Sequence, residues 1–528
     1  MNVAGAHRPI EAIVRGARIV REFQAVPGLS VVEVPPADLY AAMEALRAEP
    51  GVRYAEPDFI VHKATTPNDP LFEMQWGLLN TGQTVNNDGG LPGVDIGAVD
   101  GWKQWTGDPE FRIAVIDTGI DYLHPALTAN IWTNPGEIPE NKIDDDGNGW
   151  IDDIHGYNTS DNRPDPMDDN SHGTHVAGII GATGDDGVGT VGVNWRCKLV
   201  ALKFLDANGN GETSDAVEAL QYVIDNNIKV SNNSWGCNGC YSQALSDMIQ
   251  ASQSIGHLFI AAAGNGIEGV GVNTDEIPFY PGSYGLPNLI NVAAINNNQL
   301  KAGFSNFGFN SVHIGAPGVT VLSTVPGGNY AFFNGTSMAA PHVAGVVGLV
   351  MSRYPDFTWQ QARGRVLGTA QVIPSLLGRT VTGGLVSVTA SLGDCNGNDV
   401  DDEDEILEGT SQDCNTNLVP DECEADFDVD GTINGCDADI DGDGVFNASD
   451  LCPLSAPGFP VKPNGGPLGD ANGDCSLQLN DFQNFVSCMI FGGPGESVTR
   501  ICRTLHDFDA DLDVDMTDYL WFQNGFGR

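Results

Sequence analysis

Three short segments of the chain contain the residue types needed for nucleophilic catalysis. Asp117 stands in D-T-G directly after an apolar run, His172 opens H-G-T-H-V-A-G, and Ser337 lies near the start of G-T-S-M-A-A-P-H-V-A-G. Taken singly, each has an ordinary structural explanation, because an aspartate at a strand end often forms a turn and a serine can cap a helix. Together they supply the hydroxyl nucleophile, the base and the orienting carboxylate that amide hydrolysis requires.

A fourth segment adds an amide donor. Asn265 ends the run A-A-A-G-N after an expected buried strand, so its side chain could donate a hydrogen bond to the oxyanion of a tetrahedral intermediate. The order Asp, His, Ser differs from that of chymotrypsin and of the α/β-hydrolases, and the segment 335–339 lacks the second glycine of G-x-S-x-G. In these four motifs the sequence resembles the subtilisin-like serine proteases, or subtilases, over roughly residues 66 to 393.

The resemblance implies a role for each of these residues. Ser337 would be the nucleophile, His172 the general base and then the general acid, and Asp117 the carboxylate that orients the imidazole. Asn265 and the backbone N–H of Ser337 would form the oxyanion hole. The resemblance also implies that one segment pairs with the substrate backbone and another lines the pocket for the residue before the scissile bond. These are Ser234, Trp235 and Gly236, and then Ala262, Ala263 and Gly264. Tyr280-Pro281 resembles the cis-proline turn that the family has beside that pocket.

The elements that must position these residues follow an α/β pattern. Continuous apolar runs at 111–116, 199–202, 258–261 and 289–293 alternate with helical segments at 214–225 and 241–255. Such runs are typical of parallel strands that helices cover on both faces, and function in these folds collects at the carboxyl ends of the strands. We therefore expect residues 65–393 to form an α/β, three-layer, subtilisin-like peptidase domain with a mostly parallel sheet.

Residues 1–64 are expected to form a separate small α+β unit. Strand-like segments at 30–34, 52–54 and 59–61 surround a helix whose apolar stripe is Leu39, Met43 and Leu46, and a breaker-rich linker follows at 65–70. The unit resembles the inhibitor propeptides of subtilases, whether complete or truncated at its N-terminus. The resemblance implies that it chaperones folding and inhibits the enzyme until self-cleavage between His62 and Asn68. A plain extension is the alternative.

The distribution of charge sets residues 394–528 apart from the rest of the chain. The 24 basic and 70 acidic residues give a net charge of −46, of which −26 belongs to residues 394–528 with their 30 acidic and four basic side chains. This excess argues against nucleic acid and anionic membranes as partners. The apolar runs are also too short for a membrane span.

One acidic loop inside the peptidase domain has the spacing of a calcium site. Asp144, Asp146, Asn148 and Asp152 occupy positions 1, 3, 5 and 9 of an EF-hand-like loop that has glycine at position 6. His155 replaces the glutamate of position 12. Oxygen ligands favour Ca²⁺ over zinc, and an ion-free acidic turn is the alternative.

The tail repeats this spacing six times, which predicts calcium repeats over 394–465 and a second calcium module over 466–528. The middle loops resemble thrombospondin type 3 repeats and the last two resemble dockerin modules, although the Ser/Thr pair typical of cohesin-binding dockerins is replaced at 479–480 and 516–517. Without Ca²⁺ the carboxylates would repel one another and the tail should be largely disordered. The predicted ligands are Asp394, Asn396, Asn398 and Glu405; Asp413, Asn415, Asn417 and Glu424; Asp426, Asp428, Asp430 and Asp437; Asp439, Asp441, Asp443 and Asp450; Asp470, Asn472, Asp474 and Asp481; and Asp507, Asp509, Asp511 and Asp518.

The cysteines indicate an oxidising compartment. Eight of the eleven lie in the tail, where an even set in a loop-rich segment predicts disulfides of undetermined pairing. Cys237-Asn-Gly-Cys240 is interpreted as a loop-closing disulfide rather than a redox site, which leaves Cys197 as a buried thiol. No signal segment is visible from Met1 to Val20, so we expect either a start upstream of Met1 or a fragment.

The sequence therefore predicts a secreted, calcium-dependent serine endopeptidase that acts through an acyl-enzyme. Its expected partners are protein and peptide substrates, its own propeptide as inhibitor, and a cell-surface or matrix partner for the tail. The alternative is a non-catalytic, calcium-ordered adhesion or matrix protein that retains a protease fold.

Overall fold

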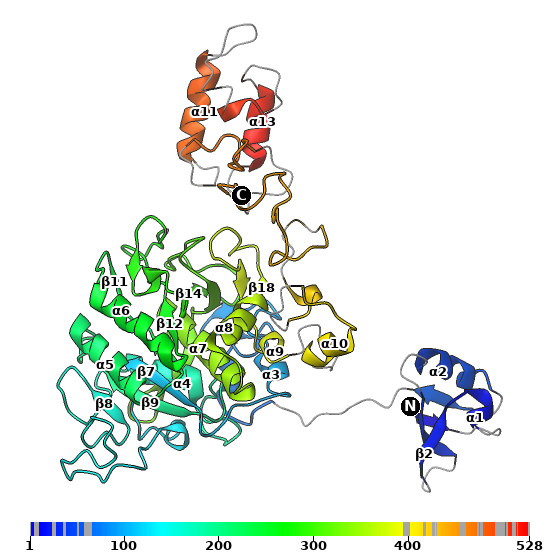
Figure 1. Ribbon diagram of the computed structural model, residues 1–528, viewed down its shortest axis with the longest axis horizontal. Helices are drawn as coiled ribbons and strands as arrows, with labels where there is room; N and C mark the ends of the chain where they lie inside the picture. The colour runs from blue at the N-terminus through cyan, green and yellow to red at the C-terminus, as the bar shows by residue number, and fades with distance from the viewer. Residues whose placement is uncertain are drawn as a thin grey trace. The chain divides into compact units, whose positions relative to one another are not determined.

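The computed structural model of the chain divides into two compact units, Met1–Ala64 and Thr65–Arg528 (Figure 1). Residues 66–393 are described without a gap. The other described residues are 2–4, 10–23, 28–34, 39–49, 52–56, 402–414, 419–424, 428, 430–452, 461–471, 475, 479–491, 502, 505–508, 514 and 516–525. Within these ranges, every helix is too short or too polar to cross a bilayer.

A nine-stranded sheet forms the centre of the second unit. Its strands lie in the order β18-β19-β15-β14-β12-β10-β7-β9-β8, and every neighbouring pair is parallel except β18 with β19. The strands are β7 (Arg112–Asp117), β8 (Gly156–Asn158), β9 (Lys198–Lys203), β10 (Val230–Asn233), β12 (Leu258–Ala262), β14 (Leu289–Ile295), β15 (Ile314–Pro317), β18 (Gln371–Val372) and β19 (Gly384–Leu385).

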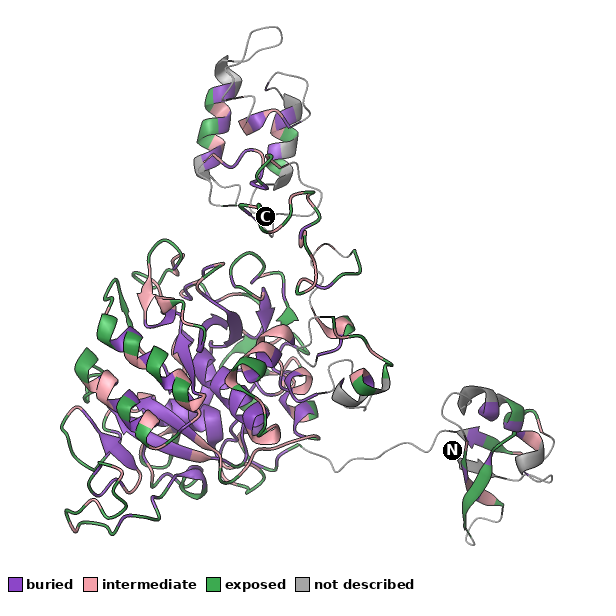
Figure 2. Cartoon of the chain, in the orientation of Figure 1, coloured by how far each residue is buried: buried purple, intermediate pink, exposed green. Residues whose placement is uncertain are grey.

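Helices cover both faces of this sheet, and Figure 2 shows its strands as buried. Successive residues of β7 point into two different cores, because Ile113 and Val115 belong to one hydrophobic cluster and Ala114 and Ile116 to the other. The first cluster includes residues of α4 and α7, and the second includes residues of α5 and α6. The predicted three-layer α/β fold is confirmed. The helices of this part are α3 (Ala98–Gly101), α4 (His172–Gly181), α5 (Thr213–Asp225), α6 (Gln243–Ala251), α7 (Thr336–Arg353), α8 (Trp359–Gly368) and α9 (Val388–Ser391).

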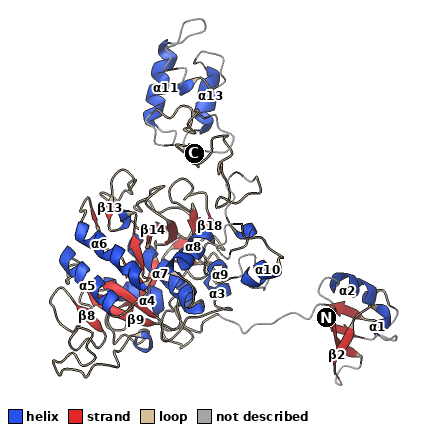
Figure 3. Ribbon diagram, viewed as in Figure 1, coloured by secondary structure: helices blue, strands red, loops and turns tan. Residues whose placement is uncertain are grey.

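Short hairpins and single turns complete residues 66–393, the region predicted to be a peptidase and called the peptidase part below (Figure 3). The predicted helix at 241–255 is split into α6 and a 3₁₀ turn, Ser252–Ile255. The paired short strands are β5 (Thr84–Val85) with β6 (Asp88–Gly89), β11 (Cys237–Asn238) with β13 (Phe279–Tyr280), and β16 (Val321–Val325) with β17 (Asn329–Phe333). Further 3₁₀ turns are Phe72–Met74, Thr128–Asn130 and Gly282–Tyr284.

The first unit is a four-stranded antiparallel sheet with two helices. Its strand order is β2-β3-β1-β4, and Met43 and Leu46 of its longer helix are buried in its core. The strand expected at 30–34 and the helix are present, the strand expected at 52–54 is displaced to 54–56, and that at 59–61 lies outside the described residues. The elements are β1 (Asn2–Ala4), α1 (Ile10–Ile13), β2 (Arg18–Phe23), β3 (Leu29–Glu33), α2 (Leu39–Arg47) and β4 (Tyr54–Glu56).

The acidic tail contains short helices and disulfides. A fully buried ion pair between Arg365 of α8 and Asp402, 3.1 Å long, attaches α10 (Asp402–Glu408) to the peptidase part. A 3₁₀ turn follows at Asp421–Cys423. The helices expected after the last two loops are present as α11 (Leu479–Phe491) and α13 (Met516–Gly525), whose Phe485 and Phe522 rings stack 4.9 Å apart. The described disulfide pairs are Cys414–Cys436, Cys452–Cys475 and Cys488–Cys502.

Candidate active site

Asp117 and His172 form a hydrogen-bonded pair at the carboxyl edge of the sheet. Asp117 is the last residue of β7 and is fully buried, and His172 is the first residue of α4. Asp117 Oδ1 accepts hydrogen bonds from His172 Nδ1 and from the backbone N–H of Thr118, each 2.7 Å long. Because Nδ1 donates to the carboxylate, Nε2 is the nitrogen that can accept a proton.

A glycine allows this close approach of α4 to the D-T-G turn. A methyl group on Gly173 would overlap the carbonyl oxygen of Gly119 and lie 3.1 Å from Thr118 Oγ1. The backbone N–H of Gly173 instead donates to Thr118 Oγ1 over 2.9 Å. A residue without a side chain is therefore needed after His172, where α4 packs against the D-T-G turn.

A second carboxylate beside His172 was not identified from the sequence. Asp168 is buried, and its Oδ1 accepts hydrogen bonds from Thr118 Oγ1 (2.9 Å) and from two backbone N–H groups of the turn before α4. Its Oδ2 accepts from the N–H and the hydroxyl of Thr174. The recognisable signal is an acid placed before the helix start, in D-D-N-S-H.

The two carboxylates set the acidity of the histidine. Burial lowers the pKa of His172, but the charge of Asp117, the hydrogen bond to it and the charge of Asp168 together outweigh burial and leave that pKa above its ordinary value. The imidazolium is therefore stabilised at this site.

Ser337 lies at the second position of α7, against the segment that follows β10. Its Oγ donates to the carbonyl oxygen of Ser234 (3.1 Å), and the Ser234 hydroxyl donates to the carbonyl oxygen of Ser337 (2.8 Å). Within the described residues, no hydrogen bond joins Ser337 Oγ to His172. The structure thus pairs Asp117 with His172 and holds the serine hydroxyl on Ser234.

Asn265 and the start of α7 place two donors around one point. The side-chain oxygen of Asn265 accepts from the N–H (2.9 Å) and the hydroxyl (3.0 Å) of Thr336, so the amide nitrogen is on the opposite side. A methyl group on Gly335 would lie 3.4 Å from Asn265 Nδ2 and 3.5 Å from the backbone nitrogen of Ser337. An anion near this point could accept hydrogen bonds from both groups. The anchoring role of Thr336 was not predicted.

The predicted substrate segments follow neighbouring strands. Ser234 to Gly236 continue from β10, and Ala262 to Gly264 continue from the adjacent strand β12. Ala262 and Ala263 are buried, and the Trp235 ring packs edge-on against Phe204 with 4.7 Å between centroids. The side chains of Ala262, Ala263 and Trp235 thus pack against other parts of the protein.

Three further predictions about single residues and pairs are confirmed. The Tyr280–Pro281 peptide bond is cis. Cys237 and Cys240 form a disulfide, and Cys197 is a free, fully buried cysteine whose thiol pKa burial raises to about 12.

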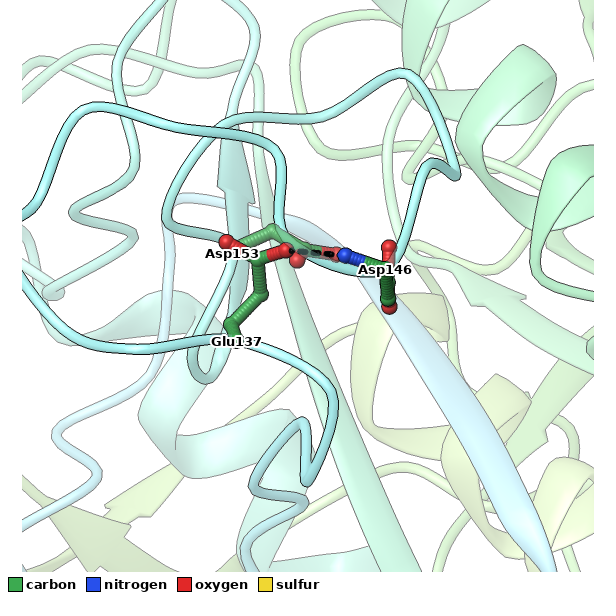
Figure 4. Close-up of side chains that lie close together, drawn as sticks. All are labelled: Glu137, Asp146 and Asp153. Atoms are coloured by element: carbon green, nitrogen blue, oxygen red, sulfur yellow. Dashed lines mark hydrogen bonds between the residues drawn. The ribbon is translucent and has the colours of Figure 1, made fainter.

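The acidic loop of the peptidase part gathers a different set of carboxylates from the one that spacing predicts. Glu137, Asp146 and Asp153 have ligand atoms within 4.8 Å of one another, and only Asp146 belongs to the predicted set (Figure 4). The Asp144 carboxylate accepts from the N–H groups of residues 147, 148 and 149, and that of Asp152 accepts from those of residues 141 and 142. Asn148 donates its side-chain amide to Asp153 over 3.1 Å.

Protein donors satisfy this cluster. The Glu137 carboxylate accepts three backbone N–H groups, and Asn134 Nδ2 donates to Asp146 (2.9 Å) and to Asp153 (2.7 Å). Tyr222 donates its hydroxyl to the other Asp153 oxygen, and the second Asp146 oxygen accepts a backbone N–H. Burial raises the pKa of Asp153 to about 6 despite these bonds. Both oxygens of all three carboxylates thus have a donor.

The tail has two further clusters, in which the described residues supply donors to only some of the carboxylate oxygens. Asp428, Asp430 and Asp437 form one, and Asp439, Asp441 and Asp443 form the other. Four buried carboxylate oxygens in this region have no hydrogen-bond partner among the described residues, namely Oδ2 of Asp437, Oδ1 of Asp439, Oδ2 of Asp443 and Oδ2 of Asp450. The other oxygen of each accepts one backbone N–H at 2.7–3.0 Å.

These surroundings raise the pKa values of two carboxyl groups in this part of the tail. Burial, followed by the charges of Asp441, Asp450 and Asp439, raises the pKa of Asp443 to about 6, and burial also raises that of Asp450. A hard divalent cation would offset these effects, because it supplies the missing partner for each oxygen.

The other predicted ligands of the tail are only partly described. In the loop 470–481, both end carboxylates are buried and Asp481 Oδ1 accepts the N–H of Ala471, so the two ends of the loop meet. Asp518 is likewise buried and accepts the N–H of Phe508. Glu405, Asp413, Glu424 and Asp507 are described but join no metal-sized cluster in the described part of the chain. The predicted ligands outside the described residues are Asp394, Asn396, Asn398, Asn415, Asn417, Asp426, Asn472, Asp474, Asp509 and Asp511.

Comparisons with known proteins agree with this geometry. The profile of the Subtilase family matches residues 108–405. A thermophilic serine proteinase of a Bacillus species is 36% identical over 314 residues, which cover 59% of this chain and 66% of that protein. Subtilisin-like protease 1 of Plasmodium falciparum is 33% identical over 62% of this chain and 47% of its own, so the chain spans about half to two thirds of these relatives.

Two further relatives are covered more fully. Subtilisin NAT of Bacillus subtilis subsp. natto is 33% identical over 62% of this chain and 73% of its own length. A solved protease structure from Pseudoalteromonas arctica aligns with a TM-score of 0.50 and 27% identity, over 62% of this chain and 98% of that one.

Proposed function

This chain belongs to the subtilase family, and we propose that it is a serine endopeptidase with Ser337 as nucleophile, His172 as base and then acid, and Asp117 as the orienting carboxylate. The observation that carries the proposal is the 2.7 Å hydrogen bond from His172 Nδ1 to Asp117 at the carboxyl edge of the sheet. At the same edge, Asn265 Nδ2 and the backbone N–H of Ser337 lie around one point. That arrangement matches the needs of acyl transfer.

The proposed reaction proceeds in two acyl-transfer steps. When substrate binds, the Ser337 hydroxyl leaves the Ser234 carbonyl oxygen and gives its proton to His172 Nε2 as Oγ attacks the scissile carbonyl carbon. Asn265 Nδ2 and the Ser337 N–H stabilise the oxyanion. His172 then protonates the leaving amine, and water, deprotonated by the same nitrogen, hydrolyses the acyl-enzyme.

The buried state of the Asp117 carboxylate supports its proposed role. Its Oδ1 holds the imidazole in one tautomer, and its charge raises the pKa of His172, which favours the imidazolium formed during attack. Asp168 adds a second negative charge from the opposite side of Thr118.

We also propose that Ca²⁺ orders the tail, with Asp439, Asp441, Asp443 and Asp450 as one ligand set and Asp428, Asp430 and Asp437 as another. One buried oxygen each of Asp437, Asp439, Asp443 and Asp450 has no hydrogen-bond partner among the described residues, which supports this, because burying an uncompensated carboxylate is unfavourable. Ca²⁺ would supply positive charge to these oxygens. The set Asp144, Asp146, Asn148 and Asp152 has less support, since protein N–H groups occupy its oxygens.

The first unit is proposed to be an inhibitor propeptide, removed by cleavage between residues 62 and 68. Its compact fold, separate from the rest of the chain, is compatible with that role. Secretion is proposed from the disulfides, which are typical of extracellular proteins.

The test is peptide hydrolysis by the full chain, with cleavage sites read by mass spectrometry. We expect internal cleavage by the wild type and none by Ser337→Ala. Ser352→Ala is the matched control, since it removes a hydroxyl from the far end of the same helix. Equal cleavage by the Ser337→Ala variant would refute the proposed nucleophile, and no cleavage by any processed form would favour the non-catalytic alternative.

A further inference from the structure

An aromatic side chain of the protein itself lies between the two proposed substrate segments. The Phe279 ring is among the groups that a methyl on either facing glycine would meet, together with the carbonyl oxygen of Tyr280 beside Gly236 and Nδ2 of Asn306 beside Gly264. A methyl on Gly236 would overlap Cε1 of the ring and lie 2.8 Å from Cζ, and a methyl on Gly264 would lie 2.8 Å from Cγ and 2.9 Å from Cδ2. The ring therefore touches the backbone of both segments at once and fills the space between them.

The position of this ring is fixed by its own strand. Phe279 lies in β13, opposite Asn238 in the antiparallel pair with β11, and its N–H donates to Ser283 Oγ over 3.1 Å. The Cys237–Cys240 disulfide closes the turn that β11 begins. Next to it, the Tyr280 ring packs against two other tyrosine rings at centroid distances of 4.8 and 5.3 Å. Displacing Phe279 would disturb contacts on several sides.

The surrounding backbone explains why an aromatic ring fits there. The two segments leave the ends of neighbouring parallel strands, where the edge of an α/β sheet opens into a crevice. Both bordering positions are glycine, so neither projects a side chain into the gap, and Gly264 has a φ of +97° that other residues rarely adopt. A flat aromatic ring fits a narrow apolar slot between two glycine backbones, and here the Phe279 ring fills that slot.

We infer that Phe279 fills the pocket for the substrate residue before the scissile bond, so that the enzyme selects glycine, alanine or serine at that position. The inference rests on the proposed endopeptidase function and on the substrate segments assigned there. Phe279 is half-buried, so part of the side chain is accessible. In this proposal that part forms the floor of a shallow site. A large apolar residue would have to expel this ring before it could bury its own side chain, which removes the gain from burial.

The test compares the hydrolysis of two peptide p-nitroanilides that differ only in the residue before the scissile bond, alanine or phenylalanine. The enzyme is freed of residues 1–64 and keeps its tail. For the wild type, we expect kcat/KM to be at least about tenfold higher with alanine. In Phe279→Gly the slot is open, so kcat/KM for the phenylalanine substrate should rise at least about tenfold relative to that for the alanine substrate. The ratio of the two values is measured on one sample, so it does not depend on the fraction of folded enzyme.

Two further variants complete the design. Phe357→Ala is the matched control, because it removes a half-buried phenyl ring stacked on Tyr354 at the other end of α7, and it should keep the wild-type ratio. Phe279→Ala should shift the ratio in the same direction as Phe279→Gly and serves if the glycine variant does not fold. A wild type that cleaves the phenylalanine substrate as well as alanine, or an unchanged ratio in a folded Phe279 variant, overturns the inference and leaves the proposed function standing. Failure to cleave either substrate, with no labelling of Ser337 by a serine-directed reagent, overturns both.

Discussion

The peptidase part and the acidic tail bury carboxylates in opposite surroundings. In the peptidase part, Asp168, Glu137 and Asp153 have hydrogen-bond donors on both oxygens. In the tail, Asp443 and Asp450, with Asp437 and Asp439, each bury one oxygen that has no partner in the described part of the chain. The protein itself completes the first arrangement, whereas the second leaves carboxylate oxygens for which we propose a cation as the partner.

Asp117 is the informative exception inside the peptidase part. Among the residues that the structure describes, Asp117 Oδ2 is buried without a hydrogen-bond partner, as is one oxygen of Asp69, while Asp117 Oδ1 accepts two hydrogen bonds. An unshared negative charge next to His172 is what stabilisation of an imidazolium requires. Buried carboxylates therefore fall into three kinds: those saturated with protein donors, Asp117 at the proposed catalytic site, and the tail group that we propose binds Ca²⁺.

The largest effect is expected from breaking the Asp117–His172 bond. Asp117→Asn keeps the size of the side chain but removes its charge, so we expect kcat to fall on the order of 10⁴-fold. Steady-state kinetics at several calcium concentrations measures this. Because the missing charge belongs to the catalytic edge and not to an ion site, added Ca²⁺ should restore nothing, and recovery of activity with Ca²⁺ would break the comparison.

The oxyanion donors should give the next largest effect. Asn265→Ala removes the amide nitrogen beside Ser337, and we expect kcat to fall about 10²- to 10³-fold, the size of loss seen in subtilisin, with KM little changed. Thr336→Val should give a smaller loss in the same direction, because it removes only the hydroxyl that holds the Asn265 side chain. Unchanged turnover in Asn265→Ala would remove this residue from the oxyanion hole.

Measuring Ca²⁺ affinity compares the carboxylates of the two regions directly. Asp443→Asn should weaken the Ca²⁺ affinity of the full chain at least about tenfold at one site, because a partnerless carboxylate oxygen is lost. Asp146→Asn is the matched control in the donor-saturated loop and should change calcium uptake less. Isothermal titration calorimetry distinguishes them, and the reverse order of effects would show that the two regions have been assigned the wrong way round.

The smallest effect concerns pH. The His172 base must be neutral, so kcat/KM rises as pH increases through the raised pKa of this residue. Asp168→Asn removes a charge that raises that pKa, so the acidic limb of the pH profile should move to lower pH, with kcat/KM on the plateau changed less than about tenfold. Asp169→Asn is the control, since it removes the same charge from a half-exposed neighbour paired with Lys203. A limb that stays in place in Asp168→Asn would exclude the electrostatic role.

Local sequence patterns predicted the central sheet and the four motifs around the active site well. The apolar runs of β7, β9, β12 and β14 are continuous because both faces of these strands are covered, and that feature is visible in one dimension. The motif at Asn265 likewise lies within a few residues of its strand. In the first unit, by contrast, β1 and β2 were not predicted, because β1 is only three residues long and β2 is exposed along its whole length and has no alternating pattern.

Residues that act through long-range pairing were missed. Phe279 reaches the proposed pocket only because β13 pairs with β11, some 40 residues earlier. Asp168 acts through Thr118, 50 residues away, and the cluster of Glu137 and Asp153 depends on Asn134 and on Tyr222 from α5. The calcium spacing of residues 144–152 was visible in the sequence, but the backbone N–H groups that occupy these carboxylates depend on the folded loop.

The most direct test of the proposed catalytic centre is covalent labelling with a serine-directed phosphonyl fluoride, mapped by mass spectrometry on the chain freed of residues 1–64. The account predicts one phosphonyl group per chain, on the peptide that contains Ser337, and none in Ser337→Ala. Folded, processed protein that takes up no reagent, or that carries it on Ser234 or another serine, would contradict the account.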